Sequence, residues 1–144
     1  MIRKARKADS AVLARLAVQL WPDNAPDDLR SAFEELTEAE DSACFIKYEG
    51  EEPVGFAQCQ LRRDYVEGTE TSPVGYLEGI FVLEGHRCRG YAKELLERCE
   101  AWSREMRCSE FASDCELGND ESLKFHLAVG FEEANRIICF RKRI

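Results

Sequence analysis

The sequence has few of the residues from which metal centres and redox motifs are built. It contains two histidines and seven cysteines, and no two cysteines have C-x-x-C spacing. Neither a zinc knuckle nor a thioredoxin-type motif is therefore present. Cys59 and Cys99 lie on apolar stripes, where cysteine acts as a small hydrophobic residue. We predict reduced, mostly buried thiols without a disulfide framework.

Long apolar runs and an excess of basic residues are also missing. No apolar stretch approaches the roughly 20 residues of a membrane helix. The basic residues 1–10 lack the apolar core of a signal peptide, so we expect a cytoplasmic protein without a membrane partner. The formal net charge of −8 argues against nucleic acid as a partner. It suits a cationic small molecule, because acidic clefts concentrate cations.

No repeat, low-complexity tract or Pro/Gly-rich linker divides the 144 residues, so residues 1–144 are expected to form one domain. Periodicity predicts the order α-α-β-β-β-α-β-α-β, and hence an α/β (α+β) fold with a mixed sheet and helices on both faces. The expected helices begin near Asp9, Asp27, Ala92 and Asn119, and the expected strands cover residues 43–49, 54–62, 76–83, 110–115 and 137–143.

The segment GHRCRGYA, residues 85–92, joins an expected strand to an expected helix. The first amides of a helix have no internal partner, and the helix dipole is positive there, so this junction can bind an anion. Gly90 lets the backbone approach a phosphate, and Arg87 and Arg89 add positive charge. The spacing lacks the features of a P-loop or a dinucleotide fingerprint, so a plain charged turn fits these residues equally well. His86 and Cys88 have no second pair of ligands, which argues against a metal.

Glu78 is a carboxylate inside an otherwise apolar strand, and Gly79 follows it. A charge in that position must be paired, solvated in a cleft or functional. The glycine indicates a bulge or a close backbone approach that splays the sheet. The alternative is an edge strand with Glu78 facing water.

Other polar and aromatic residues have two interpretations each. Asp114 ends the strand EFASD, where α/β sheets place ligand-binding groups, but it could also cap a turn. Asn119 could cap the helix that follows it. Trp21 and Tyr65 lie in polar loops, where an aromatic residue is either a partly buried anchor or a ligand platform.

Taken together, these stretches resemble the GNAT (GCN5-related N-acetyltransferase) superfamily over essentially the whole chain. Arg87-x-x-Gly90-x-Ala92 is similar to its Q/R-x-x-G-x-G/A acetyl-CoA loop, and SLKFHLAVGF is similar to its carboxyl-terminal helix with a Gly-Phe pair. The resemblance implies a largely antiparallel sheet that is splayed at the acetyl-CoA strand.

The sequence resembles the aminoglycoside 6'-N-acetyltransferases still more closely. The similar stretches are QLWP (19–22), RRDYVEGTETSPVGYLEGIFVLEGHRCRGYA (62–92), EFASD (110–114) and FEEANRIICFRKR (131–143). The resemblance implies direct transfer of acetyl from acetyl-CoA to the 6'-amine of an aminoglycoside, without an acyl-enzyme or a metal. It also implies a homodimer.

The resemblance also assigns roles to individual residues. Main-chain groups of Ile80, Phe81 and Val82 are expected to bind the pantetheine arm and the thioester carbonyl. The pyrophosphate is expected at Arg87 and at the amides of Cys88, Arg89, Gly90, Tyr91, Ala92 and Lys93, and Asn119 is expected to touch the cofactor. The antibiotic site is expected to contain Trp21, Asn24, Tyr65, Glu78, Asp114 and Asn135.

An ammonium group has no lone pair, so a base must deprotonate the acceptor before it attacks the thioester. We favour Asp114 as this base, with Glu78 as its partner or alternative. The chain has His126 where many acetyltransferases have a tyrosine that protonates the leaving thiolate; His126 can donate a proton or be structural. Asn135 and Asn24 replace acidic and histidine residues of some relatives, which affects the drug profile rather than the reaction. The rival functions are acetylation of another polyamine or amino sugar, and a non-catalytic acyl-CoA-binding module.

Overall fold

The computed structural model describes residues 1–144 and contains one five-stranded sheet in the order β1-β2-β3-β4-β5. Neighbouring strands are antiparallel except for β4 and β5, which are parallel. The strands are β1 (Ile2–Lys4), β2 (Ser42–Glu49), β3 (Glu52–Arg62), β4 (Val74–Val82) and β5 (Phe111–Ser113). The mixed, largely antiparallel sheet expected from the sequence is confirmed.

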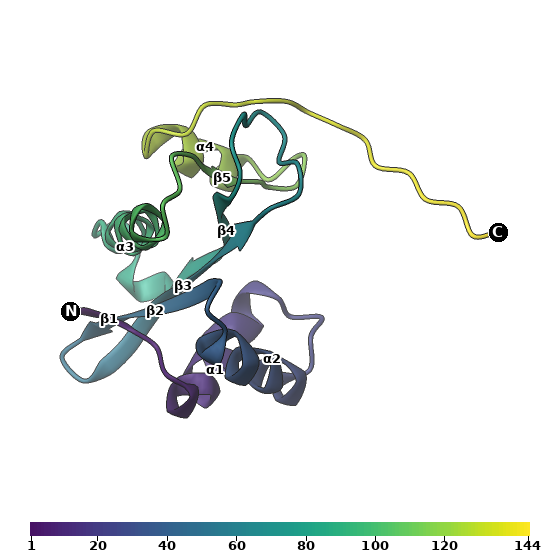
Figure 1. The fold of residues 1–144 in the computed structure, drawn as a ribbon. Helices are drawn as coiled ribbons and strands as arrows, with labels where there is room; N and C mark the ends of the chain where they lie inside the picture. Colours follow the sequence, from purple (N-terminus) through teal and green to yellow (C-terminus); the bar gives the residue numbers. More distant parts are fainter.

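Helices cover both faces of the sheet, as predicted (Figure 1). Helices α1 and α2 pack on one face, and α3 and α4 lie on the other side (Figure 1). The helices are α1 (Ser10–Leu20), α2 (Pro26–Glu38), α3 (Tyr91–Glu105) and α4 (Asp120–Ala128), with short 3-10 turns η1 (Lys7–Asp9) and η2 (Glu84–His86). The chain thus forms three layers, with the sheet in the middle.

The core consists of one hydrophobic cluster on each face of the sheet. Successive residues of β2 point to opposite faces, so Ile46 packs with Leu13 of α1 and Phe33 of α2 on one face. Phe45 packs on the other face with Leu95 of α3. Because both faces are covered, β2 and β3 are buried over most of their length, which explains why their alternation in the sequence is imperfect.

The two ends of the chain differ from the sequence-based expectation. Residues Ile2–Lys4 form β1, which was not predicted because a strand of three residues carries no periodic signal. The predicted final strand at 137–143 is wrong for the single chain: residues 131–144 belong to no helix or strand. Residues 131–135 still contact the body, through Phe131 and Asn135, and the segment beyond them runs away as an extended tail (Figure 1), where no neighbouring strand offers hydrogen bonds.

The cysteines are free, and Cys44, Cys59, Cys99 and Cys108 are buried, whereas Cys88, Cys115 and Cys139 are exposed. Burial raises the pKa of the Cys44 thiol to about 12, which keeps it protonated and unreactive at neutral pH. No group of three or more potential ligand side chains is arranged to hold a metal ion. None of the helices combines the length and the apolar character that a membrane span requires.

Candidate active site

The strands β4 and β5, the last two of the sheet, separate after a short pairing and leave one edge of β4 open. Their parallel pairing covers only Gly75–Leu77 of β4 and ends at Ser113 of β5. On its other side, β4 remains paired with β3 as far as Val82. Residues 78–82 therefore have no strand partner toward β5, and a bound amide chain can take the place of the missing strand. Ile80 and Phe81 lie on this open segment, as expected from the sequence.

Glu78 lies at the point where the strands begin to separate. The register of β3 with β4 shifts there: Gln58 pairs with Gly79, and Cys59 pairs with Leu77, so Glu78 is the extra residue of a β-bulge. The bulge inferred from the sequence is confirmed. The edge-strand alternative is wrong, because β4 lies between β3 and β5.

An arginine from β3 neutralises the Glu78 carboxylate. Arg62 Nε donates to Glu78 Oε1 over 3.0 Å, and Arg62 Nη2 donates to Glu78 Oε2 over 2.9 Å. This bidentate geometry is the strongest form of a carboxylate–guanidinium pair. Glu78 is thus a paired charge, and both of its oxygens accept from Arg62 in this conformation.

Gly79 brings Trp21 onto the same part of β4. A Cβ atom on Gly79 would lie 2.6 Å from Cζ2 of the Trp21 ring, so only glycine permits this approach. The indole also packs edge-on against Phe56, with 6.0 Å between the ring centroids. Asn24 Nδ2 donates to the Trp21 carbonyl over 3.4 Å. The loop after α1 therefore reaches the bulge, as the prediction for Trp21 requires.

Asp114 follows β5 directly and is connected to β4 through Tyr76. The Tyr76 hydroxyl donates to Asp114 Oδ2, and burial together with this carboxylate raises the pKa of the phenol well above its usual value. Arg62 stacks over the Tyr76 ring with 3.5 Å between its Cζ and the ring centroid. Asp114 is exposed and keeps Oδ1 without a protein partner. The network thus holds Asp114 in place while one oxygen remains open to solvent.

The sequence-based reasoning missed Tyr76 and Arg62. Tyr76 lies two residues before Glu78 in the same strand, which was a usable signal, because alternate residues of a strand share a face. Arg62 ends β3 and comes next to Glu78 only through the hairpin register, which periodicity does not reveal.

His126 of α4 is held between its own helix and β5. Its Nε2 lies 2.8 Å from Ser113 Oγ, and its Nδ1 lies 2.7 Å from the Ser122 carbonyl. Its ring packs against Phe131, with 5.1 Å between the centroids. The structure therefore brings His126 to the end of β5, where the strands separate.

The loop that precedes α3 presents a row of unused amides. None of the backbone N–H groups of residues 88–93 donates to a backbone carbonyl or to a side chain, and Glu94 is the first to bond, to the Gly90 carbonyl. Cys88 and Gly90 have positive φ values of 60° and 81°, which bend the loop into the start of the helix. Free amides at a helix N-terminus form an anion-binding site, so the geometry favours the phosphate interpretation over the plain turn.

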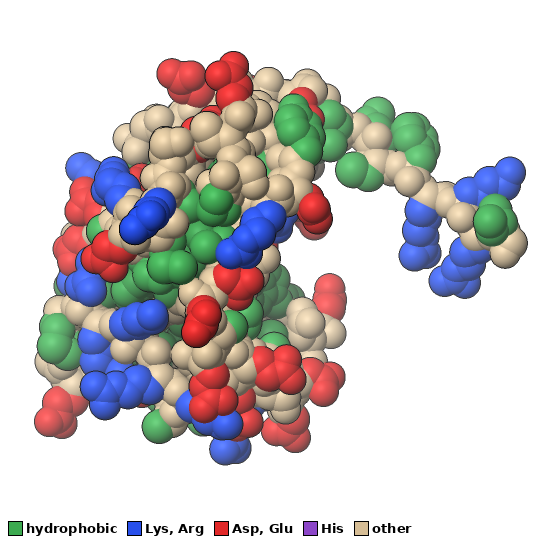
Figure 2. Space-filling model, in the orientation of Figure 1, with side chains coloured by type: hydrophobic (Ala, Val, Ile, Leu, Met, Phe, Trp, Pro, Cys, Tyr) green, Lys and Arg blue, Asp and Glu red, His purple; other side chains and the backbone are tan.

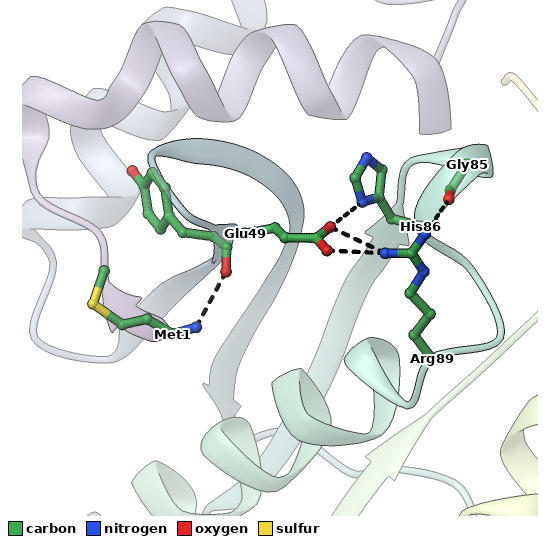
Figure 3. Close-up of polar contacts among 6 residues, drawn as sticks. Met1, Glu49, Gly85, His86 and Arg89 are labelled. Carbon is green, nitrogen blue, oxygen red and sulfur yellow. Dashed lines mark hydrogen bonds and ion pairs between the residues drawn. The ribbon is translucent and has the colours of Figure 1, made fainter.

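The arginine side chains of this loop do not point together into a phosphate site. Arg87 Nε donates to the Val82 carbonyl over 2.9 Å, so this carbonyl, which was expected to bind pantetheine, is already in use. Arg89 Nη1 donates to Glu49 at the end of β2 over 2.9 Å, as Figure 3 shows. His86 Nδ1 lies 2.5 Å from the same carboxylate and, by hydrogen bonding, lowers the pKa of Glu49 (Figure 3).

Lys47 of β2 contacts the first turn of α3. Lys47 Nζ lies 2.5 Å from Glu94 Oε2 and 4.4 Å from the centroid of the Tyr91 ring. The Lys47 side chain is only 9% exposed, so this pair is shielded from salt better than a surface pair. Strand β2 therefore positions both the loop and the helix start, although the sequence analysis assigned it no role.

The structure also places three further residues that were predicted to contact the substrates. Asn119 Oδ1 accepts from the Ser122 amide over 3.2 Å and caps α4, which confirms the capping interpretation; its contact with the cofactor stays a prediction. Tyr65 is 77% exposed in the loop between β3 and β4. Asn135 Nδ2 donates to Glu67 in the same loop over 2.9 Å.

Comparison with known families shows to which family the chain belongs. The model of the acetyltransferase (GNAT) family matches residues 11–131, which include the open strand, the amide loop and α4. The chain belongs to the GNAT family of acetyltransferases. The resemblance inferred from the sequence is confirmed.

Named relatives within this family are also similar over nearly the full chain. An aminoglycoside N(6')-acetyltransferase type 1 of Salmonella typhimurium is 46% identical over 129 residues, covering 89% of this chain and 88% of the relative. A protein of the same name from Stenotrophomonas maltophilia is 42% identical over 140 residues, covering 97% and 91%.

Solved GNAT structures show the same architecture. AAC(6')-Iy in complex with the bisubstrate analogue CoA-S-monomethyl-acetylneamine superimposes with a TM-score of 0.96 at 41% identity, covering 100% of this chain and 98% of that one. AAC(6')-Ih from Acinetobacter baumannii superimposes with a TM-score of 0.91 at 35% identity, covering 100% and 98%. The chain thus shares its overall fold with these solved proteins.

We expect Glu49→Gln to tighten coenzyme A binding roughly three- to fivefold. The Glu49 carboxylate holds Arg89 and places a negative charge beside the phosphate loop. An exposed ion pair of this kind is weak, whereas a guanidinium–phosphate pair is a strong charge-assisted interaction, so the released Arg89 should prefer the phosphate. Isothermal titration of coenzyme A measures the change. The double variant with Arg89→Ala should lose the gain, and weaker binding by Glu49→Gln would show that the carboxylate instead orders the loop.

Proposed function

We propose that this GNAT protein transfers acetyl from acetyl-CoA to the 6'-amino group of aminoglycoside antibiotics, by direct attack in a ternary complex. The observation that carries the proposal is the opening between β4 and β5. It has free main-chain groups along one side, unused amides at residues 88–93 beyond it, and a free carboxylate at Asp114 where the strands separate. Named relatives at up to 46% identity support the choice of acceptor.

Asp114 is the general base of this reaction. Its Oδ1 is open, and Tyr76 fixes the other oxygen, so the carboxylate is oriented without being neutralised. Glu78 serves as its partner: both of its oxygens accept from Arg62, so its carboxylate is held in place beside the acceptor. A carboxylate that takes a proton directly or through one water is a standard means of freeing an amine for attack.

The acceptor lies among Trp21, Asn24, Tyr65 and Asn135, next to the two carboxylates. Figure 2 shows that the molecule is hollowed below the base of the tail, with acidic side chains around the hollow. An aminoglycoside carries several ammonium groups, which such a surface attracts, in accord with the net charge of −8. Trp21 supplies a flat apolar wall for a sugar ring, since Gly79 brings the indole onto the bulge.

Acetyl-CoA supplies the acetyl group and binds with its diphosphate on the amides of residues 88–93. The pantetheine arm adds to the open edge of β4 at Ile80 and Phe81, in the manner of a peptide that extends a sheet. A main-chain N–H on this edge opposite the thioester carbonyl stabilises the oxyanion that forms during attack.

Mass spectrometry tests the proposed acceptor. Kanamycin-class and gentamicin-class drugs are incubated with the protein and acetyl-CoA, and each product is fragmented to locate the modified amine. We expect one added acetyl group at the 6'-amine. Absence of an adduct on every drug, together with an adduct on a polyamine or simple amino sugar, would overturn the choice of acceptor. Because the chain has seven cysteines, thiol-release assays need a blank without acceptor.

The protein forms a homodimer in which residues 137–143 of one copy add a strand to the sheet of the other. The tail exposes Ile137 by 65%, Ile138 by 78% and Phe140 by 90%, which is costly for a segment surrounded by water. Strand β5 pairs only with β4, so its second edge is free to accept a strand. The strand that the periodicity predicts at 137–143 then forms by pairing with the second copy.

Phe140→Asp should convert the dimer into a monomer at micromolar concentration, because it places a charge in the shared apolar contact. Multi-angle light scattering after size-exclusion chromatography measures the mass. Lys142→Ala on the same tail is the matched control and should stay dimeric. A wild-type protein with the mass of a single chain would contradict the dimer.

A cytoplasmic location accords with the seven free thiols, three of which are exposed.

A further inference from the structure

Ser113 occupies the position where β4 and β5 separate. It is the last residue of β5 and pairs with Leu77, the last residue of β4 that has a partner on this side. Its hydroxyl Oγ lies 3.4 Å from the Leu77 carbonyl. The open segment of β4 begins at the next residue, so the hydroxyl lies at the inner end of the opening that takes the thioester.

Behind Ser113, the orientation of His126 is set by a fixed acceptor. The Ser122 carbonyl can only accept, so His126 Nδ1, at 2.7 Å, must carry a hydrogen. The other nitrogen, Nε2, then either accepts from Ser113 Oγ or, when the ring is protonated, donates to it over 2.8 Å. No charged side chain bonds to His126; its remaining neighbours are the rings of Phe125 and Phe131 and the Ser122 hydroxyl.

Both ring nitrogens are therefore occupied, and Nε2 faces the serine. The sequence-based hypothesis that His126 itself protonates the thiolate requires Nε2 to face the substrate. The structure instead places the Ser113 hydroxyl between the imidazole and Leu77. Tyr76 is not available for this role, because its hydroxyl donates to the Asp114 carboxylate. When His126 is protonated, the Ser113 hydroxyl donates only a long hydrogen bond, 3.4 Å, to the neutral Leu77 carbonyl.

We propose that Ser113 is the catalytic residue that donates the proton to the leaving thiolate, and that His126 supplies the proton to Ser113. The proposal rests on the acetyl-transfer function above, but it does not depend on which amine is the acceptor. Ser113, at the end of the short strand β5, thereby has a role in the reaction that no sequence motif indicated.

Collapse of the tetrahedral intermediate re-forms the carbonyl from the oxyanion and breaks the carbon–sulfur bond, whose electron pair moves to sulfur. Sulfur takes the proton of Ser113 Oγ while Oγ takes the proton of protonated His126 Nε2, so the serine never becomes an alkoxide. The attacking nitrogen is positively charged in the intermediate and loses its second proton to water, which leaves a neutral amide. His126 is left neutral with its hydrogen on Nδ1 and regains a proton from water, and Asp114 returns the first proton of the ammonium group to water.

Ser113→Ala should lower the single-turnover rate of acetyl transfer roughly 10- to 50-fold, with KM for acetyl-CoA within about twofold of wild type. Ser113→Thr keeps a hydroxyl and should restore most of the rate. His126→Phe should cause a similar loss, and the double variant should be no slower than either single one, because the two residues act as one unit. Rapid-quench mass spectrometry follows the reaction of a kanamycin-class drug.

Two further measurements separate this role from a structural one. Ser109→Ala changes an exposed serine just before β5 and should leave the rate unchanged. The solvent deuterium isotope effect on the single-turnover rate should shrink in Ser113→Ala, since the proton relay is removed. A wild-type rate in Ser113→Ala would overturn the proposal, as would multiplicative losses in the double variant or a threonine variant as slow as alanine.

Failure of the relay can be told from failure of the proposed function. If the wild-type protein acetylates a different amine, the same variants are measured with that amine, because thiolate release is common to every acceptor. A loss with any acceptor supports Ser113. An unchanged rate overturns the relay and leaves the acceptor assignment intact.

Discussion

Asp114→Asn is expected to lower kcat roughly 10²- to 10³-fold while KM for acetyl-CoA changes less than about threefold. The amide has the size of the carboxylate and can still accept the hydrogen bond from Tyr76, but it cannot take a proton from the ammonium group. Steady-state kinetics with an aminoglycoside that the wild type acetylates measures both constants.

Tyr76→Phe is the matched control for this substitution. It removes the hydroxyl that holds Oδ2 and leaves the carboxylate in place, so the expected loss in kcat is only about three- to tenfold. If Asp114→Asn instead weakens only acetyl-CoA binding, Asp114 is not the base. A larger loss in Glu78→Gln than in Asp114→Asn would transfer the role to Glu78.

Gly90→Asp should raise KM for acetyl-CoA roughly 10- to 100-fold, which corresponds to about 1.4 to 2.8 kcal/mol of binding free energy. The substitution places a carboxylate at the start of α3, beside the amides that would receive the diphosphate. There it repels the phosphates and competes for the same N–H groups. Fluorescence or calorimetric titration of coenzyme A checks the effect.

Gly90→Asn separates charge from backbone strain. Both side chains tolerate the positive φ of 81° at this position about equally, and no atom lies within 4 Å of an added Cβ. The asparagine variant should therefore bind coenzyme A within about fivefold of wild type. Equal weakening in both variants would mean that loop conformation, rather than charge at the amides, controls binding.

Local signals in the sequence predicted the parts of the fold that depend on neighbouring residues. The stripe of α3 places Leu95, Leu96 and Cys99 in the core, as its helical spacing indicates. Glycine after Glu78 predicted the bulge, and the strand–loop–helix pattern predicted where unused amides would lie. These features require only the period of an element or the chemistry of its end.

Pairs that join distant parts of the chain could not be obtained in this way. Arg62 pairs with Val74 in the β3–β4 hairpin, and its long side chain reaches along β4 past the Tyr76 ring to Glu78. Tyr76 meets Asp114 only across the short parallel pairing of β4 with β5. Glu49 meets the phosphate loop from the far end of β2. A pattern of residue types says which side chains could pair, but not which of the several available charges will be adjacent.

The tail also separates what local sequence patterns predict from what contacts between distant residues decide. Alternating apolar residues at 137–143 have the character of a strand, yet a strand exists only where another strand supplies its hydrogen bonds, and none lies beside it in the single chain. The sequence by itself determined the family, the helices, the interior strands and the position of the loop with unused amides before α3. Only the tertiary structure decided which carboxylate is paired and which is free, and that Ser113 lies between His126 and the open strand. The reason is physical: periodicity and end chemistry act over a few residues, whereas register and the separation of β4 from β5 depend on contacts between residues far apart in the chain.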